Sequence, residues 1–257
     1  MKIAVSGKGG VGKTTIASTL AKLLAKSHDM VYAIDADPDA CLAAAVGIDQ
    51  DKIDDLTPVV EMKDIIAGQS GGDGAFYSLN PNMDELFEKY SIKMDNIRFF
   101  RMGGIKQGGS ACYCRENTFL NAFVTNLMYD KNSALIMDMG AGIEHLTRGT
   151  ARSVDIMLVV VEPSKNSVNT AKLVQKLAAD LGIKKVVIIG NKIRNEKEKE
   201  FIQNNFHAEE ILGLVSFDEE VWDSAMDKGP ADLKGELLAS MEKIHDKLLR
   251  EVGEGLA

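Results

Sequence analysis

Residues 7–14 read Gly-Lys-Gly-Gly-Val-Gly-Lys-Thr, and this stretch decides the fold. It fits the pattern G-x-x-x-x-G-K-[ST], in which glycines let the backbone curl so that several N–H groups point at phosphate oxygens. The apolar run at 2–6 predicts a strand before the loop, and the spacing of apolar residues at 14–26 predicts a helix after it. Strand, loop and helix in this order predict a P-loop NTPase fold, because the helix start is aimed at the bound anion.

The rest of the chain repeats the alternation of strands and helices. Further strands are expected at 30–34, 97–102, 134–139, 155–161, 185–189 and 211–215, and helices at 40–46, 116–129, 167–181, 196–204, 218–228 and 232–252. Several strands are uninterrupted apolar runs, which is typical of a parallel sheet covered on both faces. We therefore expect one α/β domain over 1–257, with a mostly parallel central sheet flanked by helices on both faces. Residues 50–95 predict only turns and short helices.

Charge and hydropathy restrict the classes of partner. The net charge of −8 and the pI of about 5.1 disfavour binding to nucleic acid or to an anionic membrane surface. Apolar runs stay far below the roughly 18 residues of a membrane helix, and the first residues lack the features of a signal peptide. The sequence therefore predicts a cytoplasmic protein without a nucleic-acid or membrane partner.

Within the loop, each residue type has a defined task. Lys13 supplies positive charge to the β- and γ-phosphates, and the hydroxyl of Thr14 is a ligand for Mg²⁺. The predicted cofactors are therefore ATP and Mg²⁺. Nucleotide contacts are expected from Gly9, Gly10, Val11, Gly12, Lys13, Thr14 and Thr15.

A second lysine early in the loop, Lys8, makes the sequence resemble the deviant Walker A family, which includes the nitrogenase iron protein and the MinD and ParA ATPases. The resemblance implies that Lys8 reaches across a homodimer interface to the partner's nucleotide. There it would stabilise the charge that develops during phosphoryl transfer. The plainer alternative is a solvated surface lysine.

Two aspartates match the switch segments of that family. Asp37, in the Asp-Ala-Asp-Pro stretch at 35–38, resembles the first switch, where it would orient the attacking water or hold a water bound to Mg²⁺. Asp138 resembles the second switch, where it would lie in the outer shell of Mg²⁺ while Gly142 senses the γ-phosphate. Gly140 stands where many family members have proline. Helix capping is the ordinary alternative for carboxylates at strand ends.

Asn191 resembles the asparagine with which the family reads adenine, since an amide can both donate to and accept from the base edge. Arg194 could stack on the base. It also stands where a guanine-reading N-K-x-D motif would have its aspartate, which favours ATP over GTP. An ordinary turn at Gly190 and Asn191 is the alternative.

Cys112 and Cys114 flank a single tyrosine and offer two thiolates. Zinc and nickel-thiolate sites usually need four ligands, and a symmetric homodimer would supply them. The pair therefore predicts a Zn²⁺ or Ni²⁺ site shared across the dimer, with a redox pair or buried apolar cysteines as alternatives. Cys41, among alanines, is predicted to pack in the core.

The loop lysine, the cysteine pair and residues 140–150 together resemble the CooC-type maturation ATPases of carbon monoxide dehydrogenase. The resemblance implies an ATP-hydrolysing metallochaperone that forms a homodimer with ATP, metal or both and assists nickel insertion into carbon monoxide dehydrogenase.

Two other functions stay open. A MinD/ParA-like positioning ATPase is the first: a MinD-like protein would end in a basic amphipathic membrane helix, whereas the polar face of 232–252 mixes acidic and basic residues and suits packing on the sheet. A ParA-like protein would bind DNA, which the acidic charge balance disfavours. An iron–sulfur cluster scaffold ATPase, or a reductase resembling the nitrogenase iron protein, is the second alternative.

Overall fold

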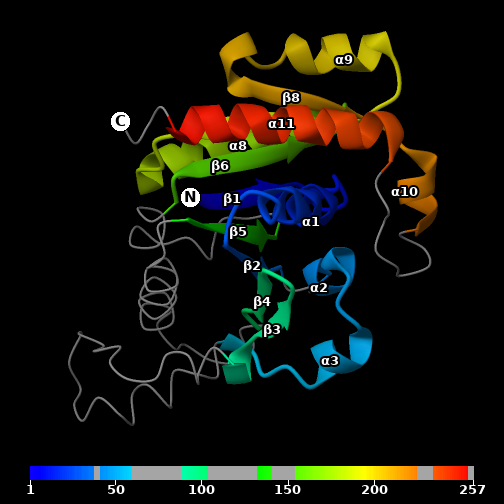
Figure 1. The fold of residues 1–257 in the computed structure, drawn as a ribbon. Helices are drawn as coiled ribbons and strands as arrows, with labels where there is room; N and C mark the ends of the chain where they lie inside the picture. Colours follow the sequence, from blue (N-terminus) through cyan, green and yellow to red (C-terminus); the bar gives the residue numbers. More distant parts are fainter. Residues whose placement is uncertain (38–40, 60–87, 104–131, 141–153, 225–233, 254–257) are drawn as a thin grey trace, which may run out of the picture.

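The computed structural model describes residues 1–37, 41–59, 88–103, 132–140, 154–224 and 234–253. These residues form an eight-stranded sheet in the order β3-β4-β2-β5-β1-β6-β7-β8, between two layers of helices (Figure 1). All strand pairs are parallel except β3 with β4. The predicted α/β fold with a mostly parallel sheet is confirmed.

The elements follow one another in the predicted alternation. The strands are β1 (Lys2–Gly7), β2 (Met30–Ala36), β3 (Ile92–Met94), β4 (Ile97–Arg101), β5 (Ser133–Met139), β6 (Ile156–Val161), β7 (Val186–Ile193) and β8 (Ile211–Ser216). The helices are α1 (Lys13–Leu24), α2 (Leu42–Val46), α3 (Gln50–Asp54), α8 (Lys165–Leu181), α9 (Glu196–Gln203), α10 (Glu219–Ser224) and α11 (Gly235–Gly253), with a short 3₁₀ turn at Ala208–Glu210.

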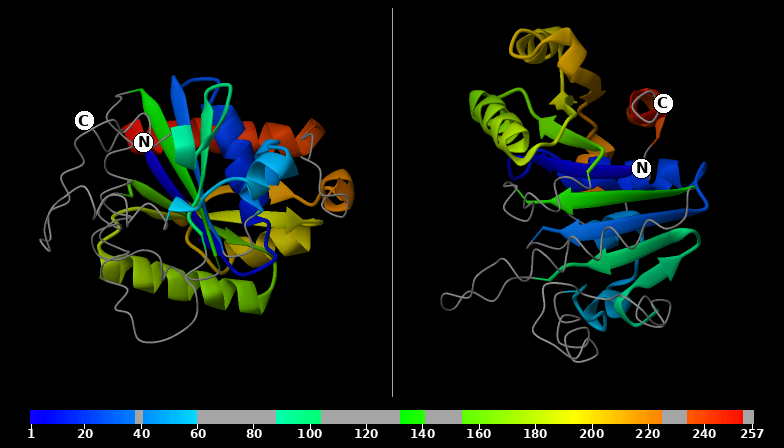
Figure 2. Two further views of the ribbon diagram at one scale, coloured as in Figure 1. Left: turned by 90° about the horizontal axis from the view of Figure 1, so that it is seen from below. Right: turned by 90° about the vertical axis from the view of Figure 1, so that its left-hand side faces the viewer.

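The two helical layers follow from the alternation of side chains along the strands. In β1, Ile3 and Val5 belong to the core under α1 and α11, whereas Ala4 belongs to the core under α8 and α9. Figure 2 shows α1 and α11 on one side of the sheet and α8 on the other. Strands β5 and β6 are buried along their whole length, as expected for a sheet with both faces covered.

Helix α11 packs on the sheet, as its charge pattern predicts. Its apolar residues Met241, Ile244 and Leu248 are at most 2% exposed and lie in the core with residues of β8 and α1. Across the described part of the chain, no helix combines the length and the apolar character needed to cross a membrane.

The structure differs from the expected elements in two places. Strand β7 continues to Ile193, four residues beyond its predicted end. In this extension its register with β8 is irregular after Gly190, and Lys192 has a positive φ of 60°. Strand β3 lies in the segment 50–95, for which only turns and short helices are predicted, whereas the short helix α3 agrees with that prediction. The helix expected at 116–129 lies outside the described residues.

Gly213 sets how closely α11 approaches β8. A methyl group added there would lie 2.8 Å from Cδ1 of Ile244, and closer still to Cγ1 of the same side chain. Because Ile244 is only 2% exposed, it has little room to move away.

We therefore expect Gly213→Ala to lower the free energy of unfolding by about 1–3 kcal/mol, the usual cost of overpacking a core. Urea unfolding of Gly213→Ala, Ile244→Ala and the double variant measures it. The Ile244 truncation should cost less in the Gly213→Ala background than in the wild type, whereas strictly additive effects would contradict a direct clash.

Candidate nucleotide-binding site

The carboxyl ends of β1, β2, β5 and β7 meet at one edge of the sheet, next to a pocket of about 410 Å³. Ligands of open parallel sheets bind at this edge. The pocket is lined by Gly9, Gly10, Gly12, Lys13, Thr14, Thr15, Asp37, Cys41, Asn191, Lys192, Ser216, Phe217, Asp218, Val221, Trp222 and Leu237. Most predicted nucleotide contacts are therefore brought together here, and Val11 lies buried behind them.

Two glycines of the loop are required by close contacts as well as by their backbone. Gly7 has a φ of 146°, and a side chain there would meet the carbonyl oxygen of Val160. Gly12, directly before the first residue of α1, has a φ of 93°. A side chain there would clash with the side-chain amide of Asn191. The glycine pattern thus reflects the tight curl of the loop between β6, β7 and α1.

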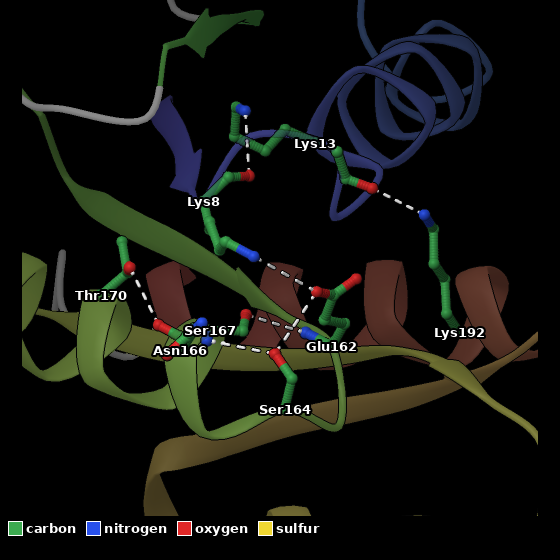
Figure 3. A network of polar contacts seen from close by, with 9 residues as sticks. Lys8, Lys13, Glu162, Ser164, Asn166, Ser167, Thr170 and Lys192 are labelled. Carbon is green, nitrogen blue, oxygen red and sulfur yellow. Dashed lines mark hydrogen bonds and ion pairs between the residues drawn. The ribbon is translucent and has the colours of Figure 1, made fainter.

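The two lysines of the loop point in different directions (Figure 3). Lys13 is 6% exposed; its Nζ donates to the carbonyl of Lys8 at 3.3 Å and lies 3.9 Å from Oδ2 of Asp37. Lys8 is 40% exposed at its side chain, and its Nζ lies 3.8 Å from Oε1 of Glu162, just after β6. Lys13 therefore places its charge inside the loop, whereas Lys8 extends towards the start of α8.

Asp138 and Thr14 form a short contact at the start of α1. The Thr14 hydroxyl donates to Oδ2 of Asp138 at 2.6 Å, and Oδ1 of Asp138 is buried without a hydrogen-bond partner in the described part of the chain. Burial raises the pKa of Asp138 to about 6, although the Thr14 hydrogen bond and the charge of Lys13 act in the opposite direction. A hydroxyl beside a buried carboxylate oxygen that accepts no hydrogen bond is a donor set that fits Mg²⁺.

Asp35 lies at the edge of the candidate site, although the sequence analysis assigned it no role. It is 1% exposed and accepts hydrogen bonds from the backbone N–H of Leu42 at 2.9 Å and of Asp37 at 3.2 Å. Burial raises the pKa of Asp35 to about 7, and the nearby charge of Asp138 adds to the shift. Asp35 thus holds the backbone that carries Asp37. The sequence signal for this contact is the Asp-Ala-Asp pattern, in which Asp35 stands two residues before Asp37.

Asn191 and Arg194 lie near each other in sequence but make different contacts. Asn191 is 7% exposed, and its Nδ2 donates to the carbonyl of Val11 at 2.8 Å, which ties β7 to the phosphate loop. The guanidinium carbon of Arg194 lies 4.5 Å from the centre of the Phe217 ring, outside the residues that line the pocket. A contact of either residue with a base stays a prediction.

The structure describes Cys41 but not the pair Cys112 and Cys114. Cys41 is exposed, at the residue before α2, and lines the pocket, so the predicted core packing is wrong: Leu42, Ala43 and Val46 occupy the buried side of α2. Cys112, Cys114 and Gly142 lie outside the described residues. Within the residues that are described, no group of three or more His, Cys, Asp or Glu side chains could hold a metal ion.

The family of the chain follows from its match to a known nucleotide-binding domain. The model of the CobQ/CobB/MinD/ParA nucleotide binding domain matches residues 2–231. The chain belongs to this family. It is therefore an ATPase of the class to which MinD, ParA and CooC belong.

Relatives of the family are similar over nearly the whole chain. An uncharacterized ATP-binding protein of Methanocaldococcus jannaschii is 40% identical, over 97% of this chain and 98% of the relative. The carbon monoxide dehydrogenase accessory protein CooC of Rhodospirillum rubrum is 37% identical, over 85% of this chain and 84% of CooC.

Solved structures share the fold of this family at lower identity. MinD in the MinC:MinD complex of Aquifex aeolicus has a TM-score of 0.70 and 21% identity, over 97% of this chain and 95% of that one. A ParA family ATPase of Chlorobium tepidum has a TM-score of 0.69 and 19% identity, over 96% and 98%.

The raised pKa of Asp35 makes the stability of this ATPase depend on pH. Between about pH 4 and about pH 7 the native state keeps a proton that the unfolded chain has released, so the free energy of unfolding falls as pH rises, by up to roughly 1.4 kcal/mol per pH unit. We expect Asp35→Asn to flatten this slope, measured by urea unfolding of nucleotide-free protein from about pH 5 to about pH 7.

The matched control is Asp51→Asn, an exposed aspartate on α3. It should keep the slope of the wild type. Asp138, whose pKa is raised to about 6, keeps its part of the slope in Asp35→Asn. A slope as steep as in the wild type would show that Asp35 does not contribute to it.

Proposed function

We propose that this ATPase is an ATP-dependent metallochaperone that assists nickel insertion into carbon monoxide dehydrogenase. The similarity to CooC, which covers 85% of this chain at 37% identity, carries the proposal. The Cys112-Tyr-Cys114 stretch supports it, because two thiolates per protomer suit a soft or borderline metal.

In the proposed reaction, the residues of the loop bind and orient the triphosphate of ATP. The backbone at 9–15 surrounds the phosphates, Lys13 neutralises the β- and γ-phosphates, and Asp37 orients the attacking water. The 3.9 Å between Lys13 Nζ and Asp37 Oδ2 supports this assignment, since it brings the two side chains together beside the loop. Mg²⁺, held by Thr14 and through water by Asp37 and Asp138, would offset charge on the phosphate oxygens.

Lys8 acts on the nucleotide of a second copy of the chain in this proposal. Its side chain is partly exposed and extends away from Lys13, so it does not occupy its own loop. A lysine that reaches a partner's phosphates makes hydrolysis depend on the dimer.

The metal is the cargo of the proposed cycle. Cys112 and Cys114 of two protomers hold Ni²⁺ or Zn²⁺ with four thiolates, and ATP with metal favours the closed dimer. Hydrolysis opens the dimer and changes the thiolate geometry, so that the metal passes to carbon monoxide dehydrogenase.

A positioning ATPase of the MinD/ParA type is the second candidate. The solved structures of that type share the fold, at 21% identity and below in the two cases described above. The apolar face of α11 is buried on the sheet and is therefore not available for a membrane surface. This observation speaks against a role of α11 as a membrane helix.

The first test separates the roles of the two loop lysines. Lys13→Ala should abolish ATP hydrolysis, and Lys8→Ala should keep nucleotide binding but lower kcat by roughly 10³-fold or more, the scale of a missing cationic finger. Mixing the two variants should restore part of the activity, because Lys8 of the Lys13→Ala protomer can reach the intact loop of the other.

Lys93→Ala, at an exposed position on the edge strand β3, is the matched control and should hydrolyse ATP like the wild type. A mixture without recovered activity, from variants that each fold, would contradict a role for Lys8 in the partner's site.

The second test measures metal per protomer and oligomeric state on anaerobic protein after loading with nickel or zinc. The wild type should hold about half an equivalent per protomer as a dimer, because one four-thiolate site serves two chains. Cys112→Ser/Cys114→Ser should lose the metal and the ability to activate carbon monoxide dehydrogenase.

Cys41→Ser is the matched control, since it removes a cysteine that lies in the nucleotide pocket. It should keep the metal. Metal binding that survives the double substitution would contradict a metal site at Cys112 and Cys114, and the positioning ATPase would then be the favoured function.

A further inference from the structure

Two aromatic residues of the pocket lining, Phe217 and Trp222, form an aromatic wall. The ring centres lie 6.1 Å apart and the rings are inclined by 46°. Phe217 follows β8 and is fixed by its N–H, which donates to the carbonyl of Ile193 at 2.9 Å. Trp222 lies on α10, whose first turn is capped by Asp218. The backbone that carries each ring is therefore held by a hydrogen bond.

Lys192 connects this wall to the phosphate loop. Its Nζ donates to the carbonyl of Gly10 at 2.6 Å (Figure 3) and lies 5.0 Å from the centre of the Trp222 ring. Its φ of 60° is a strained backbone for a residue with a side chain. One ammonium group thus contacts both the loop and the indole, and it can hold the ring through a cation–π contact.

The lining of the pocket combines residues of two kinds. The residues of the phosphate loop in the lining, with Lys13 among them, suit phosphates. The apolar residues of the lining, which are Phe217, Val221, Trp222 and Leu237, suit a flat apolar ring. Trp222 is 52% exposed, so much of its large ring surface is available to a ligand.

We propose that Trp222 contacts the base of the bound nucleotide, and that Lys192 is a positioning residue that holds the indole for this contact. The inference rests on the proposed binding of ATP at the loop and assigns its base to the aromatic wall. The Asn191 amide already donates to Val11, and the Phe217 ring is contacted by Arg194, whereas Trp222 is 52% exposed, so we assign the base to Trp222.

Trp222 is the single tryptophan of the chain, which makes intrinsic fluorescence specific for this position. ADP should change the emission on binding. Inorganic tripolyphosphate, which has phosphates but no base, should bind in calorimetry without a comparable change. An equal change with tripolyphosphate would overturn the inference, because the response would then come from the loop.

Substitution of Trp222 measures how much the base contact contributes to the affinity for ADP. Trp222→Ala should raise the Kd for ADP by about 5- to 150-fold, which corresponds to the roughly 1–3 kcal/mol of base–aromatic stacking, and should leave the Kd for tripolyphosphate unchanged. Trp222→Phe should recover most of the affinity. Leu173→Ala, at an exposed apolar position on α8, is the control and should bind ADP like the wild type.

The positioning role of Lys192 has its own measurement. Lys192→Met should shift the tryptophan emission of the nucleotide-free protein, since the indole loses its cation, and Lys192→Arg should restore it. An unchanged spectrum in Lys192→Met would overturn this part.

Different results would overturn the proposed ATP site and the base contact of Trp222. A wild-type chain that binds neither ADP nor tripolyphosphate would overturn the proposed function. A chain that binds both, with the same ADP affinity in Trp222→Ala, would overturn only the base contact.

Discussion

The parallel pairing of β1 with β5 on one side and β6 on the other holds the candidate site together. In this register Val5 lies beside Asp138, and Gly7 lies beside Val160. The loop therefore leaves the sheet between a carboxylate and a backbone carbonyl that leaves no room for a side chain at Gly7. Strand β2 extends the same alignment, since Asp35 pairs with Asp138. Because all these strands end at one edge, short loops suffice to bring their polar residues together.

This alignment concentrates negative charge in a buried place. Asp35 and Asp138 sit on neighbouring strands, and burial raises the pKa of both. The compensating groups are few: backbone N–H groups for Asp35, and the Thr14 hydroxyl with the charge of Lys13 for Asp138. Such a site is built at a cost in stability, which is common where a charged ligand completes the electrostatics.

The site residues that could be placed from sequence are those whose position follows from local order along the chain. The loop residues, Asp37 and Asp138 each directly follow or end a buried strand, so the fold alone brings them to the site edge. The roles of Asp35, Glu162, Lys192 and Trp222 depend on partners far away in sequence, such as Gly10 for Lys192, 182 positions earlier. The prediction for Cys41 was wrong because the run of alanines indicates a buried helix face but not the orientation of the residue before it. Contacts across strands have no short-range signal, which is why the fold was easier to predict than the pocket.

The ion pair of Lys8 with Glu162 has a consequence for the kinetics of the loop. Glu162 is itself placed by the turn that starts α8, where Ser164 donates to it at 3.3 Å. Both partners keep contact with water, with 40% and 27% of their side chains exposed, and such pairs are worth about 0–1 kcal/mol. A hold of this strength gives the long Lys8 chain a preferred direction while letting it exchange partners within thermal energy. The Lys8 ammonium group can therefore leave Glu162 for another anion at little cost in free energy.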